Sequence, residues 1–399
     1  MHTPKINWVL FGLYFLVSIG LLFGALIAPP IRSFAPAPVR DWIVPPPKPI
    51  ELDVLYSTEK AAWIELAAER FMADAKHKVQ GHPIQINLKA SGSREIYLSV
   101  LDGAQPDMIS PASMLQISLL QDLSTSKFGA PVVDPSDTAR CRPVLKSPLV
   151  LVAWRERADV LWGDEPNGSM WLRMHEALAN PQGWEAYGRS EWGYIKFSHT
   201  NPLKSNSGFQ TILLMSYNYF GKTSGLTSQD ILADDEFQAW FLSFENTISN
   251  FGDSTGTYMQ EIISYGPSLY DFVSVYEATA IAQMENAVGK YGELRVYYPP
   301  ATSMSDHPFC ILEGEWVASD KETAALMFLE YLSSEELQQQ ALLEYGFRPT
   351  ASIPLDQPGS PFLQYTQNGV RTDIPPEVDV PPGDVLNTLL DFWARNVQP

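Results

Sequence analysis

The sequence predicts an α/β protein made of two lobes. Between residues 52 and 345, short stretches with the period-two pattern of β-strands alternate with amphipathic stretches of helical spacing. Such alternation favours parallel sheets with right-handed crossover connections. Two apolar stretches, near Pro148 and Phe309, are suited to carry the chain out of a first lobe and back into it. We therefore expect a discontinuous first lobe, residues 51–148 and 309–399, and a second lobe, residues 149–308.

The N-terminal stretch Trp8–Ala28 contains no charged residue and is long enough to span a bilayer as a helix. Ile27 and Pro29 both disfavour signal-peptide cleavage after Ala28. We therefore expect residues 1–28 to be an uncleaved transmembrane signal anchor, with cleavage as the alternative. Residues 29–50 are rich in proline and predict an extended, semi-rigid tether.

In the first lobe, three predicted strands each end in a serine-rich turn that precedes a helix. The strands are Leu52–Tyr56, Ile84–Lys89 and Asp107–Ile109. Ligands of open α/β sheets bind beyond the carboxyl ends of the strands, where these turns fall.

In the second lobe, Ser205–Gly208 precedes a helix in which Phe209, Leu213 and Tyr217 share one face. A similar turn, Ser254–Gly256, precedes another helix, and Gln229–Asn250 reads as a single amphipathic helix. A strand ends at Tyr276, and Glu277 begins the next helix.

The last part of the chain predicts a helix pair followed by a proline-rich segment. The pair is Lys321–Leu332 and Glu335–Tyr345, in which Ser333-Ser334 and Glu335-Glu336 form the cap and first turn of the second helix. A terminal helix, Asp384–Arg395, is expected to dock through Leu386, Leu389, Leu390 and Trp393.

Composition excludes several classes of protein. The 399 residues carry a net charge of −19 without a concentrated basic patch, which argues against a nucleic-acid partner. An apolar content of 45% is sufficient for sizeable cores. The two cysteines, Cys141 and Cys310, form either one disulfide or two separate buried thiols.

The sequence contains no recognisable catalytic or metal-binding motif. We find no H-E-x-x-H, C-x-x-C, P-loop or complete dinucleotide fingerprint, and the six histidines lack the spacing of metal ligands. A Ser–His pair involving His199 has no G-x-S-x-G elbow to support it. We therefore expect no enzyme, no cofactor and no metal site.

The pieces of the sequence, in their order, resemble extracytoplasmic solute-binding proteins of ABC importers, in particular the molybdate-, sulfate- and phosphate-binding group. The resemblance covers roughly residues 52–350. It depends on Ala90–Ser93 after a strand, Pro106–Met108, Asn201-Pro202 before Ser205–Gly208, and Phe328–Pro349. It implies a periplasmic-binding-protein-like fold of type II, with a two-strand hinge and a ligand trapped between the lobes.

Five turns then become candidate ligand-binding elements, because serine hydroxyls and helix N-terminal N–H groups can hold an oxyanion. As the alternative, each turn is only a helix cap. The resemblance adds Tyr276 and Glu277 to the cleft, where Glu277 would repel a fully ionised anion. The candidate residues are Ser57, Thr58, Ser91, Gly92, Ser93, Ser110, Ser113, Ser205, Asn206, Ser207, Gly208, Ser254, Thr255, Tyr276 and Glu277.

The expected function is capture of a small ligand, such as an oxyanion, for an ABC-type importer. Its expected partners are that ligand, an ABC permease and the membrane, with monomeric lobes on the extracytoplasmic side of the cytoplasmic membrane. The alternative is a sensor or a surface interaction protein that uses the same fold without transport.

Overall fold

A computed structural model describes residues 8–27, 47–163 and 170–397. The chain divides into two compact units. The first unit is Met1–Pro49 with Gln80–Pro83 and contains helix α1 (Trp8–Ile27). The second unit, Ile50–Val79 with Ile84–Pro399, contains the two sheets and the helices that cover them.

Helix α1 has 20 residues and coincides with the predicted apolar stretch. Among the helices of the described residues, none has both the length and the apolar character that a bilayer crossing requires. This finding does not support the predicted transmembrane anchor. Most of the predicted tether, residues 29–46, lies outside the described residues, as do residues 1–7 and 28 of the predicted anchor.

The first sheet has six strands in the order β2-β3-β1-β4-β11-β5. In β1, the apolar residues Ile50, Leu52 and Val54 are buried and alternate with exposed acidic residues, as expected for a strand with one face on the core. The strands are β1 (Ile50–Ser57), β2 (Lys78–Val79), β3 (His82–Ser91), β4 (Met108–Ser110), β5 (Cys141–Pro143) and β11 (Pro308–Ile311).

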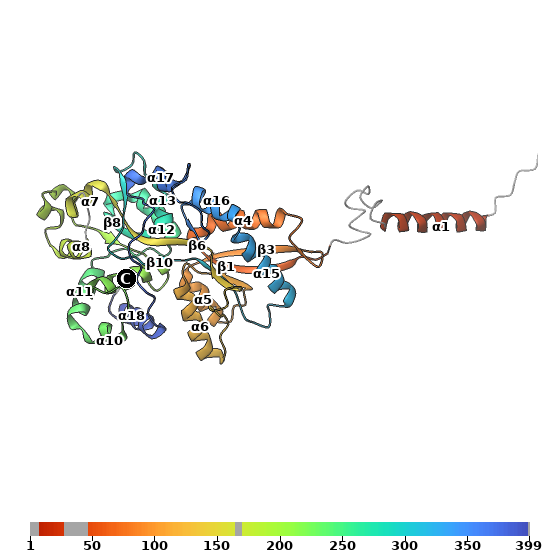
Figure 1. Ribbon diagram of the computed structural model, residues 1–399, viewed down its shortest axis with the longest axis horizontal. Coiled ribbons are helices and arrows are strands. Elements are labelled where there is room, and N and C mark those ends of the chain that lie inside the picture. The colour runs from red at the N-terminus through yellow and green to blue at the C-terminus, as the bar shows by residue number, and fades with distance from the viewer. Residues whose placement is uncertain (1–7, 28–46, 164–169, 398–399) are drawn as a thin grey trace, which may run out of the picture. The chain divides into compact units, whose positions relative to one another are not determined.

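The register of this sheet brings its serine-rich ends together. β1 is parallel to β3 and β4, with Ser57 opposite Ser91 and Tyr56 opposite Ser110. Helices around the sheet include α5 and α6, which lie side by side (Figure 1). The helices around the first sheet are η1 (Thr58–Lys60), α4 (Ala61–Ala73), α5 (Ser93–Leu101), α6 (Met114–Phe128), α15 (Ser319–Leu332) and α16 (Glu335–Tyr345).

The second sheet is built on the long strand β6 (Leu145–Trp154), whose last seven residues are all buried. β6 pairs in antiparallel fashion with four strands, and β7 runs parallel to β8. The other strands are β7 (Phe197–Ser198), β8 (Phe272–Tyr276), β9 (Leu294–Tyr297), β10 (Met304–Ser305) and β12 (Arg348–Pro349).

We call the part built around the first sheet the first half and the part built around the second sheet the second half. Most of the remaining helices belong to the second half. They are α7 (Arg155–Leu161), α8 (Met170–Ala179), η2 (Gly183–Tyr187), η3 (Ser190–Trp192), α9 (Asn206–Tyr219), α10 (Ser228–Ala233), α11 (Asp235–Glu245), α12 (Thr255–Tyr265), η4 (Gly266–Ser268), α13 (Glu277–Ile281) and α14 (Met284–Ala287).

The predicted single helix over Gln229–Asn250 is wrong, because the chain forms α10 and α11 instead. Asp234 adopts an extended conformation between them, and its side chain accepts a hydrogen bond from the Phe237 N–H at 2.8 Å. An aspartate in this role begins a new helix rather than continuing the old one.

The chain passes between the two sheets from β5 to β6 and from β10 to β11. At the first-sheet end of both crossings, Cys141 lies opposite Cys310 in antiparallel strands, and the two form a disulfide. A third segment, β12, also pairs with the start of β6. The open question of the cysteines is therefore answered by strand register, which places the two side chains next to each other.

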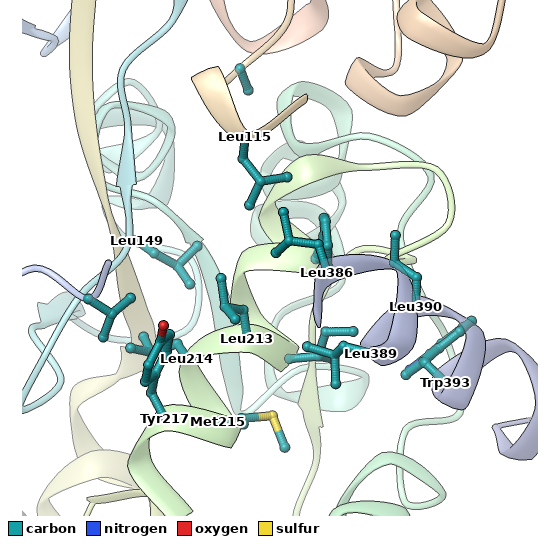
Figure 2. Close-up of a cluster of buried hydrophobic side chains, with 14 of the residues drawn as sticks. Leu115, Leu149, Leu213, Leu214, Met215, Tyr217, Leu386, Leu389, Leu390 and Trp393 are labelled. Atoms are coloured by element: carbon teal, nitrogen blue, oxygen red, sulfur yellow. The ribbon is translucent and has the colours of Figure 1, made fainter. Parts of the chain in front are cut away.

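The C-terminal segment adds α17 (Pro361–Gln364), η5 (Thr366–Asn368) and α18 (Gly383–Asn396). The four apolar residues predicted to dock α18 are buried: Leu386, Leu389, Leu390 and Trp393. α18 packs on α9 and α10 of the second half and also contacts α6 of the first half. In Figure 2, Leu115 of α6 points toward Leu386 of α18, near Leu213 of α9.

Candidate functional site

Serine-rich helix N-termini from both halves meet in one crevice. Ser113 at the start of α6 donates to Oδ1 of Asn206 at the start of α9, over 3.1 Å. Gln116 Nε2 donates to the same oxygen over 2.7 Å. The Asn206 amide then donates to the hydroxyl of Tyr276, at the end of β8, over 2.9 Å. These buried bonds connect the carboxyl ends of strands in both sheets.

A second group of hydroxyls surrounds Thr255 at the start of α12. Its Oγ1 lies 2.7 Å from Ser207 Oγ and 3.1 Å from Ser205 Oγ. Ser207 also contacts Thr200 at 2.7 Å, and the Gly208 N–H donates to the Thr200 hydroxyl. A Cβ on Gly208 would lie only 1.8 Å from the Thr200 carbonyl oxygen, so this close approach requires glycine.

Four serines occupy N-cap positions in these turns, yet their side chains do not cap the helices. Ser57, Ser113, Ser205 and Ser254 accept no hydrogen bond from the first turns of η1, α6, α9 and α12. Elsewhere in the described residues, the N-cap side chains of α10, α11, α16 and α17 do cap their helices. The alternative that these four serines are simple helix caps therefore lacks the hydrogen bonds that define a cap.

The first half contributes a buried charged group that the sequence did not single out. Lys60 Nζ donates to Ser57 Oγ at 2.6 Å and to the carbonyl oxygens of Ser110 and Pro111 at 2.9 and 3.2 Å. It also lies 3.5 Å from Oε1 of Glu59, whose side chain is 4% exposed. Lys60 thus holds the turns after β1 and β4 together.

The fully buried imidazole of His307 completes this group, with Nδ1 3.2 Å from Oε1 of Glu59. Burial lowers the pKa of His307 to about 4, despite the opposing effect of Glu59. Burial alone would raise the pKa of Glu59, but Lys60 and His307 hold it at about 2. Burial also lowers the pKa of Lys60 to about 8. At neutral pH the group is therefore an ion pair beside a neutral histidine.

Other candidate residues line the outer part of the crevice. Thr58, Ser91, Gly92 and Ser254 border a cavity of about 690 Å³, together with Glu95, Asp102, Lys204 and Asp253. Ser91 donates to Glu95 at 2.5 Å, and Lys204 pairs with Asp253 at 2.6 Å. The charged lining of this opening is therefore mostly acidic.

Two candidates have structural partners of their own. Ser93 Oγ accepts from the Ala112 N–H at 3.0 Å. Glu277 forms a buried bidentate ion pair with Arg348, at 2.7 and 2.8 Å, and accepts a hydrogen bond from Tyr298. The expected repulsion between Glu277 and an anion is thus removed, because Arg348 neutralises this carboxylate.

The structure therefore brings Ser57, Ser110, Ser113, Ser205, Asn206, Ser207, Thr255 and Tyr276 into the buried part of the crevice. The site also contains residues that the sequence did not indicate: Glu59, Lys60, Gln116, Thr200 and His307. Only the position of Glu59 and Lys60, directly after the Ser57-Thr58 turn, offered a signal for them. In the described residues, no group of three or more His, Cys, Asp or Glu side chains is arranged to hold a metal.

Comparison with known proteins assigns a family. The family described as "Bacterial extracellular solute-binding protein" matches residues 52–348, which is more than half of the chain. This match confirms the resemblance that the sequence motifs indicated. No curated protein matches the sequence.

Solved structures share the fold at low sequence identity. The periplasmic binding protein AfuA of Actinobacillus pleuropneumoniae, with bound fructose-6-phosphate, is 15% identical with a TM-score of 0.57, over 87% of this chain and 98% of that chain. Iron-bound HitA of Pseudomonas aeruginosa is 13% identical, with a TM-score of 0.57, over 88% and 100%. The sulfate-binding protein SubI of Mycobacterium tuberculosis is 16% identical, with a TM-score of 0.52, over 83% and 93%.

Proposed function

Because this chain belongs to the bacterial extracellular solute-binding proteins, we propose that it captures a small solute in the crevice between its two sheets and delivers it to an ABC-type importer. The family consists of binding proteins, so the chain is not an enzyme. Its partners in this proposal are the solute and an ABC permease outside the cytoplasm.

We further propose that the solute presents an oxyanion to the N-terminal ends of α9 and α12, while Asp306 already accepts from the first N–H of α6. The observation that carries this proposal is the set of N-cap serines that meet in the crevice without capping their helices. The first N–H groups of a helix have no partner within the helix, and they carry the positive end of its dipole. Neutral donors of this kind hold a desolvated anion without a buried counter-charge.

Calorimetric titration of the purified protein with molybdate, sulfate and phosphate tests this proposal. We expect at least one of them to bind, and Ser207→Ala to weaken that binding about tenfold through the loss of one hydrogen bond. Ser334→Ala is the matched control, since Ser334 caps α16 and its loss should cost about 1 kcal/mol of stability without changing affinity.

No heat with any of the three anions, or equal affinity in the Ser207→Ala variant, would reject the oxyanion proposal. Import is tested separately by uptake of the bound solute into cells that lack the gene. Normal uptake in those cells would favour the alternative function, a sensor or a surface interaction protein without transport.

A further inference from the structure

Among the described residues of the crevice, three buried side chains carry acceptor atoms without a hydrogen-bond partner. They are Gln116 and Gln210, each through Oε1, and His307, whose two ring nitrogens both lack one; the Ser110 hydroxyl also lacks a partner. The three residues are 2%, 1% and 0% exposed, so solvent does not supply the missing bonds. A buried polar atom without a hydrogen bond costs free energy, and most proteins keep few of them.

The neighbours of the two glutamines fix which amide atom is unpartnered. Gln116 Nε2 donates to Asn206 Oδ1 at 2.7 Å, and Gln210 Nε2 donates to the carbonyl oxygen of Met304 at 2.9 Å. The Met304 carbonyl oxygen can only accept, so Gln210 directs its NH₂ group toward it, and Gln116 directs its NH₂ group toward the Asn206 oxygen. The oxygen atoms are therefore the free atoms, and both require a donor.

His307 offers one bare ring nitrogen as an acceptor. Oε1 of Glu59 lies 3.2 Å from Nδ1, but neither ring nitrogen forms a hydrogen bond. In the neutral ring, one of the two nitrogens carries no proton and is an acceptor. The backbone N–H of His307 also donates to the Ala112 carbonyl oxygen at 3.0 Å, which ties the residue to the turn before α6.

All three acceptors lie where the two halves meet. Gln116 bonds across the crevice to Asn206, and the His307 ring lies 5.9 Å from the Tyr276 ring. Gln210 and Ser113 line a second cavity, of about 280 Å³, together with Lys146, Asp306 and Glu377. The crevice thus offers a solute unpartnered acceptors as well as the N–H donors of the helix N-termini.

We propose that the solute is an organic oxyanion that also donates hydrogen bonds, through hydroxyl or amino groups, to Gln116, Gln210 and His307. This inference rests on the proposed function, because it specifies the solute of the same crevice. An inorganic anion without a proton leaves the three acceptors without hydrogen bonds. An ester with a hydroxyl or amino group can donate to them and should therefore bind more tightly than the inorganic anion.

Three phosphate esters at about pH 8, where each phosphate is dianionic, test the proposal by calorimetry. They are methyl phosphate, which has no donor, 2-hydroxyethyl phosphate and 2-aminoethyl phosphate, with sulfate as a fourth anion. We expect at least one of the two donor-bearing esters to bind tenfold or more tightly than methyl phosphate and sulfate. Which of these two esters binds more tightly distinguishes hydroxyl from amino recognition.

Variants assign the effect to the three side chains. Gln116→Leu, Gln210→Leu and His307→Leu should each reduce the preference for the donor-bearing ester over methyl phosphate by fivefold or more. Gln340→Leu is the matched control, since Gln340 is a buried glutamine of α16 that bonds Glu344 and Arg70. Its preference should equal that of the natural protein.

Equal affinity for methyl phosphate and the donor-bearing esters would overturn this inference and leave the oxyanion proposal intact. Tight binding of ethylene glycol or ethanolamine, without any gain from the phosphate, would support donor recognition and overturn the oxyanion proposal. Failure of every compound to bind would overturn both. The ester series uses the natural protein, so these outcomes do not depend on whether the variants fold.

Discussion

His307 is a buried neutral histidine, and it makes the folded state sensitive to acid. Its pKa of about 4 lies below the ordinary value of 6.5, because burial disfavours the charged ring. The groups that face it are Glu59 and Lys60 of the first half, the ring of Tyr276 and the ring of Phe347. Glu59 titrates near 2 and Lys60 near 8, so of these facing groups only His307 changes its charge between about pH 4 and 6.5.

We expect the free energy of unfolding to fall by about 3 kcal/mol between pH 6.5 and 4 through this residue alone. The sign follows from the lowered pKa: the contribution is complete above pH 6.5, and protonation removes it as the pH falls through 4. Urea unfolding at several pH values measures it. His307→Asn keeps a residue that tolerates the positive φ of 39° and should flatten the dependence.

The control for this pH series is His82→Asn, at an exposed histidine. It should retain the full pH dependence of the natural protein. An identical slope in the His307→Asn variant would show that other groups cause the loss of stability in acid.

The pair Glu277–Arg348 is a second buried charged group, but its role is structural. Because both side chains are buried, Arg348→Met leaves an uncompensated carboxylate, and we expect a loss of about 3–5 kcal/mol of stability. The double variant Glu277→Leu, Arg348→Met should recover most of it. Chemical denaturation checks both values, and a double variant no more stable than Arg348→Met would contradict this account.

At the scale of secondary-structure elements, the disulfide between β5 and β11 joins the two strands that lead into the crossings. Its cysteines are 169 residues apart, and the closed loop contains most of the second half. Loop-entropy arguments give such a bridge about 5 kcal/mol at most. We expect Cys141→Ser with Cys310→Ser to lower the urea midpoint, and a reducing agent to do the same to the natural protein.

An unchanged urea midpoint in that double variant would show that the disulfide does not stabilise the protein by limiting the conformational entropy of the unfolded chain. Dithiothreitol should have no effect on the double variant itself. This comparison separates the loss of the bridge from any cost of placing two serines in the buried strands.

An element could be predicted from the sequence when the interactions that form it join residues close together in the chain. The apolar stretch Leu52–Tyr56 is a local signal, and it predicted most of β1 (Ile50–Ser57) from the sequence. The break between α10 and α11 depends on the cap of Asp234, which the continuous amphipathic pattern concealed. The pairing of Cys141 with Cys310 depends on the register of strands far apart in sequence, which no local pattern contains.

The same distinction applies to the candidate site. Serine-rich turns before helices are visible in the sequence, and they indicated Ser113, Asn206 and Thr255. His307 and Gln116 carry no local signal, because their importance comes from burial beside residues of distant segments. Glu277 was assigned to the cleft by resemblance alone, and its partner Arg348 lies 71 residues away.

At the scale of the whole molecule, α18 connects the two halves through apolar contacts. Leu386 is buried in the cluster that also contains Leu115 of α6 and Leu213 of α9 (Figure 2). We expect Leu386→Ala to cost about 2–5 kcal/mol of stability and to increase the radius of gyration, because the halves lose part of their connection. Small-angle X-ray scattering measures the second effect.

Leu337→Ala is the matched control for this experiment. Leu337 is equally buried, but it lies in α16, within the core cluster that includes the first sheet. This variant should lose comparable stability without a change in radius. An equal radius in all three proteins would show that α18 does not hold the halves together.

Contacts of α18 with both halves also affect the energetics of solute uptake. Separation of the halves would expose leucine side chains of α18 near α6, which is unfavourable. The apolar contacts of α18 therefore supply part of the free energy of closure, and the solute has to supply less of it. A binding protein whose conformational equilibrium favours the closed form has a higher apparent affinity for its solute. Separating the halves to release the solute then costs the free energy of the same contacts, so they oppose release as much as they favour capture.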